Sequence, residues 1–309
     1  MDISFFAAAV VAGTPLLYAI LGELITEKSG QLNLGVEGMM LMGAVIGFKM
    51  AISSGNPYLA LLGAMAAGGF GALIFAVLTV TLRANQVVSG LTLTIFGTGF
   101  ASFMGQGLMG ETVPPDIKLF FADFKVPLLG DIPFLGQIFF NQGMLVYTGY
   151  ILTIIAGVYI YRTQIGLNLR AVGENTAAAD AAGINVSLYK YIHVIIGGVL
   201  CGLAGAYLSL VYIPSWQENV TAGRGWIAVA LVIFCKWNPY RVMMGAFLFG
   251  GLDIIGFRIQ KFDFHISQYI IDLLPYVVTI IILILVSVRK SHSGSAPASL
   301  GESYFREER

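Results

Sequence analysis

The sequence predicts an all-α integral membrane protein, a polytopic bundle of about eight to ten transmembrane helices with one short or broken helix. Of the 309 residues, 57% are hydrophobic and only 11% are charged, and the mean hydropathy is +0.81. A soluble domain carries roughly 25% charged residues, so this chain has too few polar side chains to cover a water-soluble fold of its size. Composition therefore places most of the chain in a bilayer.

Apolar runs with few charges mark the predicted spans, because a helix that crosses the hydrocarbon core needs roughly 20 apolar residues. The runs that approach this length are Phe5–Leu21, Leu32–Gly47, Pro57–Leu82, Gln86–Gly107, Gly143–Tyr161, Tyr191–Ile213, Val242–Phe257 and Leu273–Val288. A further run, Trp226–Cys235, is too short to cross upright and is the predicted half helix. The N-terminus lacks a basic stretch, so the first run is predicted to be a retained span.

Basic residues predict the orientation of the chain. If the loop 162–190 is cytoplasmic, alternation of the spans puts about 11 of the 17 Lys and Arg residues on the same side. Cytoplasmic loops carry this excess of positive charge, so the N-terminus is predicted to be outside the cell and the C-terminus in the cytoplasm. The predicted location of the protein is the cell (inner or plasma) membrane. Residues 1–290 form one membrane domain with an external loop, 111–142, while the polar residues 291–309 are predicted to be a disordered cytoplasmic tail.

Several function classes find no support in the sequence. The formal net charge is zero and Lys and Arg are not clustered, so no nucleic-acid partner is expected. The three His residues are far apart and both Cys residues lie in apolar runs, so no metal site is expected. The chain has neither an H-E-x-x-H nor a G-x-S-x-G sequence, and no catalytic residue is predicted. Without a G-x-x-x-x-G-K-[ST] sequence it has no P-loop for ATP, and no cofactor of its own is expected.

Glycine is abundant inside the spans, with 38 residues in the chain. Clusters lie at Gly68-Gly69-Phe70-Gly71, at Gly97-Thr98-Gly99 and between Gly197 and Gly205. Small residues let helices approach closely in lipid, so these clusters predict a tightly packed bundle.

The loop 162–190 contains a strong helix former, Ala177–Ala182. Asn175 or Thr176 is suited to cap its N-terminus, and Gly183 to the left-handed residue after its end. The predicted product is a short helix with small side chains, parallel to the membrane. Two interpretations are open: an ordinary connecting helix, or a helix that sits in a groove on a partner protein.

The string Arg170-Ala171-Val172-Gly173-Glu174-Asn175, with the Ala-rich helix and Ala182-Gly183-Ile184 after it, resembles the coupling loop of ABC importer permeases. That group includes the ribose, branched-chain amino acid and nucleoside permeases. In the family this loop docks on the ATP-binding subunit. The resemblance therefore implies a coupling site made of Gly166, Arg170, Ala171, Val172, Gly173, Glu174, Asn175, Ala178, Ala182 and Gly183.

A second string, Asn33-Leu34-Gly35-Val36-Glu37-Gly38-Met39-Met40, looks most like the nucleoside branch of the same family. An ionised acid inside a span costs about 2.5 kcal/mol or more on insertion scales, so Glu37 should face the bundle interior or water. It is either a hydrogen-bond anchor between helices or part of the solute path. The anchor role is favoured, because a transporter of neutral solutes does not need a buried carboxylate.

A third string, Gly223–Val232, resembles the short helix that follows the family's sixth span. Relatives usually continue with a glycine pair and a proline, whereas here Phe234–Pro239 keeps the proline without the glycines. This departure leaves the local backbone after the helix open.

Uncharged polar residues gather at the start of the fourth span and suit sugars or nucleosides as solutes. Phe96 and Phe100 recur at helical spacing and are candidates to contact a base. The alternatives are backbone hydrogen bonds for the Ser and Thr side chains and core or lipid packing for the Phe rings. Thr94 belongs to this group, and the predicted solute path or bundle anchor comprises Asn33, Glu37, Asn85, Gln86, Ser89, Thr92 and Phe96.

The resemblance implies a permease subunit of an ABC importer that moves a small neutral polar solute, most nearly a nucleoside, by alternating access. The implied partners are ABC ATP-binding subunits, which hold ATP and Mg, a second and different permease subunit, and an extracellular or periplasmic solute-binding protein, with membrane lipid around the bundle. The alternatives are the same machinery for simple sugars, riboflavin or branched-chain amino acids, a stand-alone secondary transporter, or a membrane-embedded enzyme. A secondary transporter generally needs ionisable residues near the midplane of the membrane. The sequence offers few such candidates, namely Glu37, Asp253 and Asp272, which disfavours this alternative.

Overall fold

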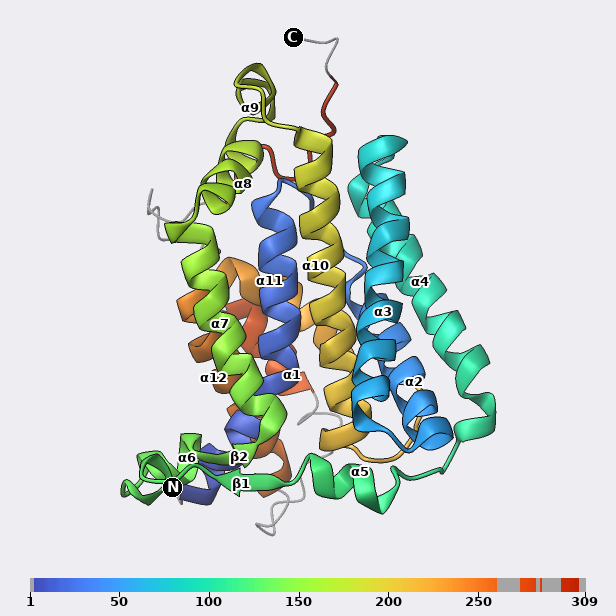
Figure 1. The fold of residues 1–309 in the computed structure, drawn as a ribbon, viewed down its shortest axis with the longest axis vertical. Coiled ribbons are helices and arrows are strands. Elements are labelled where there is room, and N and C mark those ends of the chain that lie inside the picture. Colours follow the sequence, from blue (N-terminus) through green and yellow to red (C-terminus); the bar gives the residue numbers. More distant parts are fainter. Residues whose placement is uncertain (1–2, 260–272, 282–283, 285–295, 306–309) are drawn as a thin grey trace.

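The computed structural model describes residues 3–259, 273–281, 284 and 296–305. Long helices stand side by side along the longest axis of the molecule (Figure 1). The predicted all-α membrane bundle is confirmed, since six helices in the described ranges are long and apolar enough to cross a membrane.

The candidate spans begin with α1 (Ile3–Lys28) and α2 (Val36–Ser54). They continue with α3 (Pro57–Ala76) and its π-helical end η1 (Val77–Thr81), α4 (Gln86–Gly105) and its 3₁₀ end η2 (Gln106–Leu108), α7 (Met144–Arg162), and α10 (Val186–Tyr207) with its π-helical end η4 (Leu208–Tyr212). The predicted short helix is α11 (Arg224–Phe234), with 11 residues. A helix of 21 residues, α12 (Pro239–Ile259), follows it. The predicted last span, Leu273–Val288, is helical over 273–281 and lies partly outside the described residues.

Local sequence chemistry sets several helix ends. The Asn56 side chain accepts hydrogen bonds from the N–H groups of Tyr58 and Leu59, and Pro57 occupies the first position of α3. Asn185 accepts from Leu188 at the start of α10. Such caps satisfy N–H groups that have no partner inside the helix.

Glycines form the closest helix contacts in the bundle. The central helix α10 packs on α1, α2 and α3. A Cβ atom added to Gly43 of α2 would meet the backbone of Gly202, and one added to Gly68 of α3 would meet the same residue. The predicted close packing at the glycine clusters is therefore confirmed for these helices.

The two ends of the bundle differ. At the end that holds the N-terminus, the connection between α4 and α7 carries α5 (Pro115–Phe120), β1 (Asp123–Lys125), η3 (Leu129–Asp131), α6 (Leu135–Phe139) and β2 (Asn141–Gly143). The two strands pair antiparallel, with Asp123 opposite Gly143. At the opposite end lie α8 (Gln164–Glu174) and α9 (Thr176–Ala181) (Figure 1).

The disordered tail predicted for 291–309 is wrong for residues 296–305. This segment packs at the α8–α9 end, where the Ser299 N–H donates to the Gly173 carbonyl (2.9 Å) and the Gly301 N–H to the Gly30 carbonyl (3.2 Å). Ala296 and Leu300 also pack against the main hydrophobic core. Distant backbone partners order a polar segment whose composition alone indicates disorder. The rest of the predicted tail lies outside the described residues.

Candidate functional site

The α8–α9 corner follows the capping predicted from its sequence. The Asn175 side chain accepts a hydrogen bond from the Ala178 N–H (2.9 Å), so Asn175 is the N-cap of α9. Thr176 does not cap the helix and instead donates its hydroxyl to the Val172 carbonyl (2.9 Å). Gly183 has φ +83°, the predicted left-handed conformation after the helix. The helix runs from Thr176 to Ala181, one residue earlier than the predicted Ala177–Ala182.

Exposure divides the predicted coupling residues into two groups. Gly166, Val172 and Gly173 are buried, and a Cβ at Gly173 would meet the Lys28 carbonyl. Arg170 and Ala171 are half-buried, with the Arg170 guanidinium 5.6 Å from the centre of the Tyr161 ring. The exposed members are Glu174, Asn175, Ala178, Ala182 and Gly183.

The outward side of α9 is formed by small side chains. Ala177, Ala178, Ala181 and Ala182 are exposed, while Ala179 packs inward on Val172 and Val186. We call the four exposed alanines the α9 alanine face. Because no long side chain projects from it, a second protein can approach the helix backbone closely there.

A polar cavity of about 400 Å³ lies beside this face. Its walls come from the end of α3, from α9, from the start of α10 and from the C-terminal segment. The lining residues are Val80, Arg83, Asp180, Gly183, Ile184, Asn185, Val186, Ser187 and Tyr304.

Glu37 holds the start of α11. Its Oε1 accepts hydrogen bonds from the Thr221 hydroxyl (2.5 Å) and the Gly223 N–H (2.8 Å), and its Oε2 accepts one from the Gly225 N–H (2.6 Å). A helix N-terminus has unpaired N–H groups and a partial positive charge, so a carboxylate is favourable there. The side chain of Glu37 is buried, and both of its carboxylate oxygens accept hydrogen bonds from the same chain.

Asn33 and Gln86 both act on the connection between α1 and α2. Asn33 Oδ1 accepts from the Gly35 N–H (2.8 Å), which shapes the turn that leads into α2. Gln86 Oε1 accepts from the Leu32 N–H (2.7 Å), which ties the start of α4 to the same turn. The structure thus brings Asn33 and Gln86 to one place, with Glu37 on the first turn of α2.

The other members of the predicted path lie on two different sides of α4. Asn85 caps α4 through the Val88 N–H (3.0 Å). Thr92 donates its hydroxyl to the Val88 carbonyl (2.8 Å), the backbone bond that was the open alternative for this group. Thr92 and Phe96 are exposed, whereas Ser89 is buried on the side of α4 that also holds Gln86. Thr94 donates to the Leu34 carbonyl (2.9 Å), and the Phe96 and Phe100 rings stack with centres 6.2 Å apart.

Sequence reasoning missed two polar contacts in the bundle. Glu23 and Glu27 are fully buried on α1, and the Trp237 indole N–H donates to the Glu27 carboxylate. Arg224 pairs with Asp253 at 3.0 Å between α11 and α12. Glu23 and Glu27 stand four positions apart in the sequence, which places both acids on one face of α1. This spacing was the signal in the sequence that could have revealed the first of these contacts. The predicted span ended at Leu21, seven residues before the helix does.

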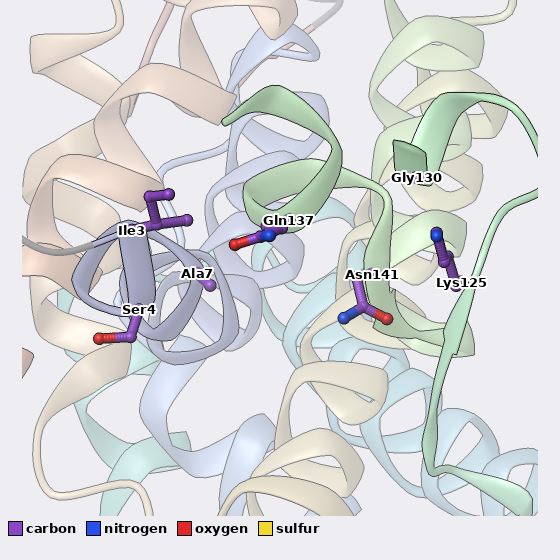
Figure 2. A pocket seen from close by; sticks show the side chains of 7 residues that line it. All are labelled: Ile3, Ser4, Ala7, Lys125, Gly130, Gln137 and Asn141. Atoms are coloured by element: carbon purple, nitrogen blue, oxygen red, sulfur yellow. The ribbon is translucent and has the colours of Figure 1, made fainter. Parts of the chain in front are cut away.

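A cavity of about 370 Å³ lies at the other end of the bundle (Figure 2). Ile3, Ser4 and Ala7 of α1 form one wall, and the opposite wall comes from the connection between α4 and α7. That wall consists of Lys125, Gly130, Gln137 and Asn141. In the described part of the chain, His, Cys, Asp and Glu side chains form no group of three that could hold a metal ion.

Comparison with known proteins identifies the family of the chain. The family model for the permease component of the branched-chain amino acid transport system matches residues 4–286. The "Putative glucose ABC transporter permease protein TsgC13" of Haloferax volcanii is 38% identical, over 97% of each chain. The guanosine ABC transporter permease protein NupQ of Bacillus subtilis is 35% identical over 89% of each chain. The nucleoside ABC transporter permease protein NupC of Lactococcus lactis is 34% identical over 90% of each chain. The chain therefore belongs to the family of branched-chain amino acid transport system permease components.

Proposed function

We propose that the chain is the membrane-spanning permease subunit of an ABC importer and moves a small neutral polar solute, most nearly a nucleoside, by alternating access. ATP hydrolysis takes place on a partner subunit that binds ATP and Mg. The observation that carries the coupling role is the α9 alanine face. The helix that carries this face is short, is capped by Asn175 and is followed by the left-handed residue Gly183. The face itself is exposed at one end of the bundle.

The proposed partners follow from the two ends. ATP-binding subunits dock at the α8–α9 end, which faces the cytoplasm, and a solute-binding protein delivers the solute at the end that holds the N-terminus. A second permease chain of different sequence completes the path. The excess of basic residues on the α8–α9 side supports this orientation.

Nucleosides are the first candidate solute because the Bacillus and Lactococcus relatives are named for guanosine and nucleosides. The Asn33–Met40 string also looks most like that branch. Sugars are the second candidate, because the Haloferax relative is named for glucose and matches over more of the chain. In both cases the solute is neutral, and the only acid on α2, Glu37, is already engaged by the start of α11.

The docking proposal is tested by placing a large side chain on the α9 alanine face. Ala178→Trp should lower the amount of ATP-binding subunit that co-purifies with the permease by about tenfold or more, equivalent to about 1.4 kcal/mol of binding free energy. Leu119→Trp is the matched control, because Leu119 is 77% exposed at the opposite end. If Ala178→Trp retains its partner and its uptake, α9 is not the docking helix.

The solute is tested with the assembled complex in proteoliposomes, supplied with its binding protein and ATP. Saturable uptake of labelled guanosine or uridine that unlabelled glucose does not inhibit would support the nucleoside proposal. Saturable uptake of glucose without uptake of a nucleoside would assign the chain to sugars. Uptake of leucine alone would contradict both candidates.

A further inference from the structure

Residues 296–305, which we call the C-terminal strap, connect three separate parts of the α8–α9 end. The Ser299 N–H donates to the Gly173 carbonyl at the end of α8 (2.9 Å), and the Gly301 N–H donates to the Gly30 carbonyl after α1 (3.2 Å). The Glu302 carbonyl accepts from the Gln86 amide at the start of α4 (3.3 Å). The strap therefore contacts α8 and α4 at the same time.

Side chains hold both ends of the strap. The Tyr304 hydroxyl donates to the Asp180 carboxylate on α9 (2.7 Å). Phe305 lies under Arg83, whose guanidinium carbon is 4.7 Å from the ring centre. At the other end, the Ala298 N–H donates to the Glu174 carboxylate (3.3 Å). Charge-assisted hydrogen bonds and a cation–π contact of this kind are stronger than neutral surface contacts.

Gln86 continues the connection into the bundle. Its amide nitrogen binds the strap, while its carbonyl oxygen accepts from the Leu32 N–H (2.7 Å). Leu32 stands four residues before α2, and on the first turn of that helix Glu37 holds α11. A displacement of α9 is therefore linked to the starts of α2, α4 and α11 by hydrogen bonds that short backbone segments join.

We propose that the C-terminal strap is a second coupling element, which transmits movement of α8–α9 to α2 and α4, with Tyr304 and Gln86 as its positioning residues. This inference rests on the proposed function, in which α8–α9 moves with the ATP-binding subunit. Apart from the strap, α8–α9 contacts α1, α7 and α10, and Gly173 of α8 also packs on the turn that follows α1. The strap adds a route to the helices whose starts carry Glu37 and Gln86.

The test measures solute transported per ATP hydrolysed by the whole complex in proteoliposomes. Tyr304→Phe removes one hydroxyl, Phe305→Ala removes the ring under Arg83, and Gln86→Ala removes both ends of the Gln86 bridge. Each should lower transport per ATP by about fivefold or more while the ATP-binding subunit still co-purifies and still hydrolyses ATP. Phe305→Tyr keeps the ring and should restore the ratio.

Glu302→Gln is the matched control, because the Glu302 side chain is exposed and its backbone carbonyl makes the contact with Gln86. An unchanged ratio in Tyr304→Phe and Gln86→Ala would overturn the proposal. Loss of the ATP-binding subunit from these variants would also overturn it, because the strap would then be part of the docking surface. Tyr304→Phe alone carries the test if Phe305→Ala does not fold. Failure of the proposed function differs from all of these, since the parent chain would then co-purify no ATP-binding subunit.

Discussion

Glu37 is an acidic residue on the first turn of a candidate membrane span, α2. An ionised acid inside a span is costly unless it is paired. The Glu37 carboxylate accepts hydrogen bonds from the N–H groups of Gly223 and Gly225 and from the hydroxyl of Thr221. All three donors lie at the start of α11. The geometry fits the anchor role that the sequence favoured, and a role in the solute path stays a prediction.

Removing this carboxylate should weaken the fold. Glu37→Ala leaves two backbone N–H groups and a hydroxyl without their acceptor in a buried place, and each buried unpaired group costs about 1 to 3 kcal/mol. We expect a loss of roughly 3 kcal/mol or more in the free energy of unfolding, and a smaller loss for Glu37→Gln, which keeps one carbonyl acceptor.

The measurement is the thermal midpoint of the detergent-purified protein. Glu111→Gln is the control, because this carboxylate is exposed at the end that holds the N-terminus. A Glu37→Ala protein that melts with the control would show that the α11 start does not need the carboxylate.

Single-residue roles were predictable where the partner is close in sequence. Asn175 caps α9 through a residue three positions away, and Gly183 lies two positions after the last residue of that helix. Gln86 was predicted only as a polar residue, because its partners Leu32 and Glu302 are 54 and 216 positions away. Nothing in the local sequence encodes contacts at such separation.

Among the helices, α4 offers a direct comparison of two glycines. A Cβ at Gly97 would lie about 2.5 Å from the Gly38 backbone of α2, whereas one at Gly99 would have no atom within 4 Å. The two residues are two positions apart and therefore lie on different faces of the helix. Only Gly97 is needed for the α2–α4 contact.

Gly97→Ala should separate α2 from α4 and lower the thermal midpoint, because overpacking costs typically 1 to 3 kcal/mol. Gly99→Ala should leave stability unchanged or raise it by up to about 1 kcal/mol, since alanine is the better helix former. Both variants are compared in the same detergent, and each is the control for the other. Equal midpoints would contradict the packing assigned to Gly97.

The membrane bundle and the short α11 were predictable because length and hydropathy carry that information directly, whereas the expected eight to ten spans compare with six candidate spans in the described residues. The β1–β2 pair was not, since each strand has three residues and pairs across a long connection. The C-terminal strap was predicted as disordered because its composition is polar, and its order comes from Gly30, Gly173 and Gln86 on other elements.

At the scale of the whole molecule, the two ends of the bundle define the proposed orientation. Ser187 is exposed at the α8–α9 end, and Leu128 is 86% exposed at the opposite end. Both native cysteines, Cys201 and Cys235, are buried. Thiol labelling therefore has a low background for single introduced cysteines.

A membrane-impermeant maleimide should label Leu128→Cys in intact cells and Ser187→Cys only after the membrane is permeabilised. The expectation follows from the positive-inside rule, which places the α8–α9 end in the cytoplasm. The unsubstituted chain gives the background signal in both conditions. Labelling of Ser187→Cys in intact cells would reverse the proposed orientation.

The Glu37 contact also sets an order of events during synthesis. Glu37 and Thr221 are 184 positions apart, so at about 5 to 20 residues per second α2 exists for roughly 10 to 40 s before its partner has been translated. During that interval the acid has neither the hydroxyl nor the N–H groups that later surround it. Until α11 emerges, this acid must therefore stay in contact with water or with the insertion machinery. Quality control of this protein has an opportunity to act in that interval.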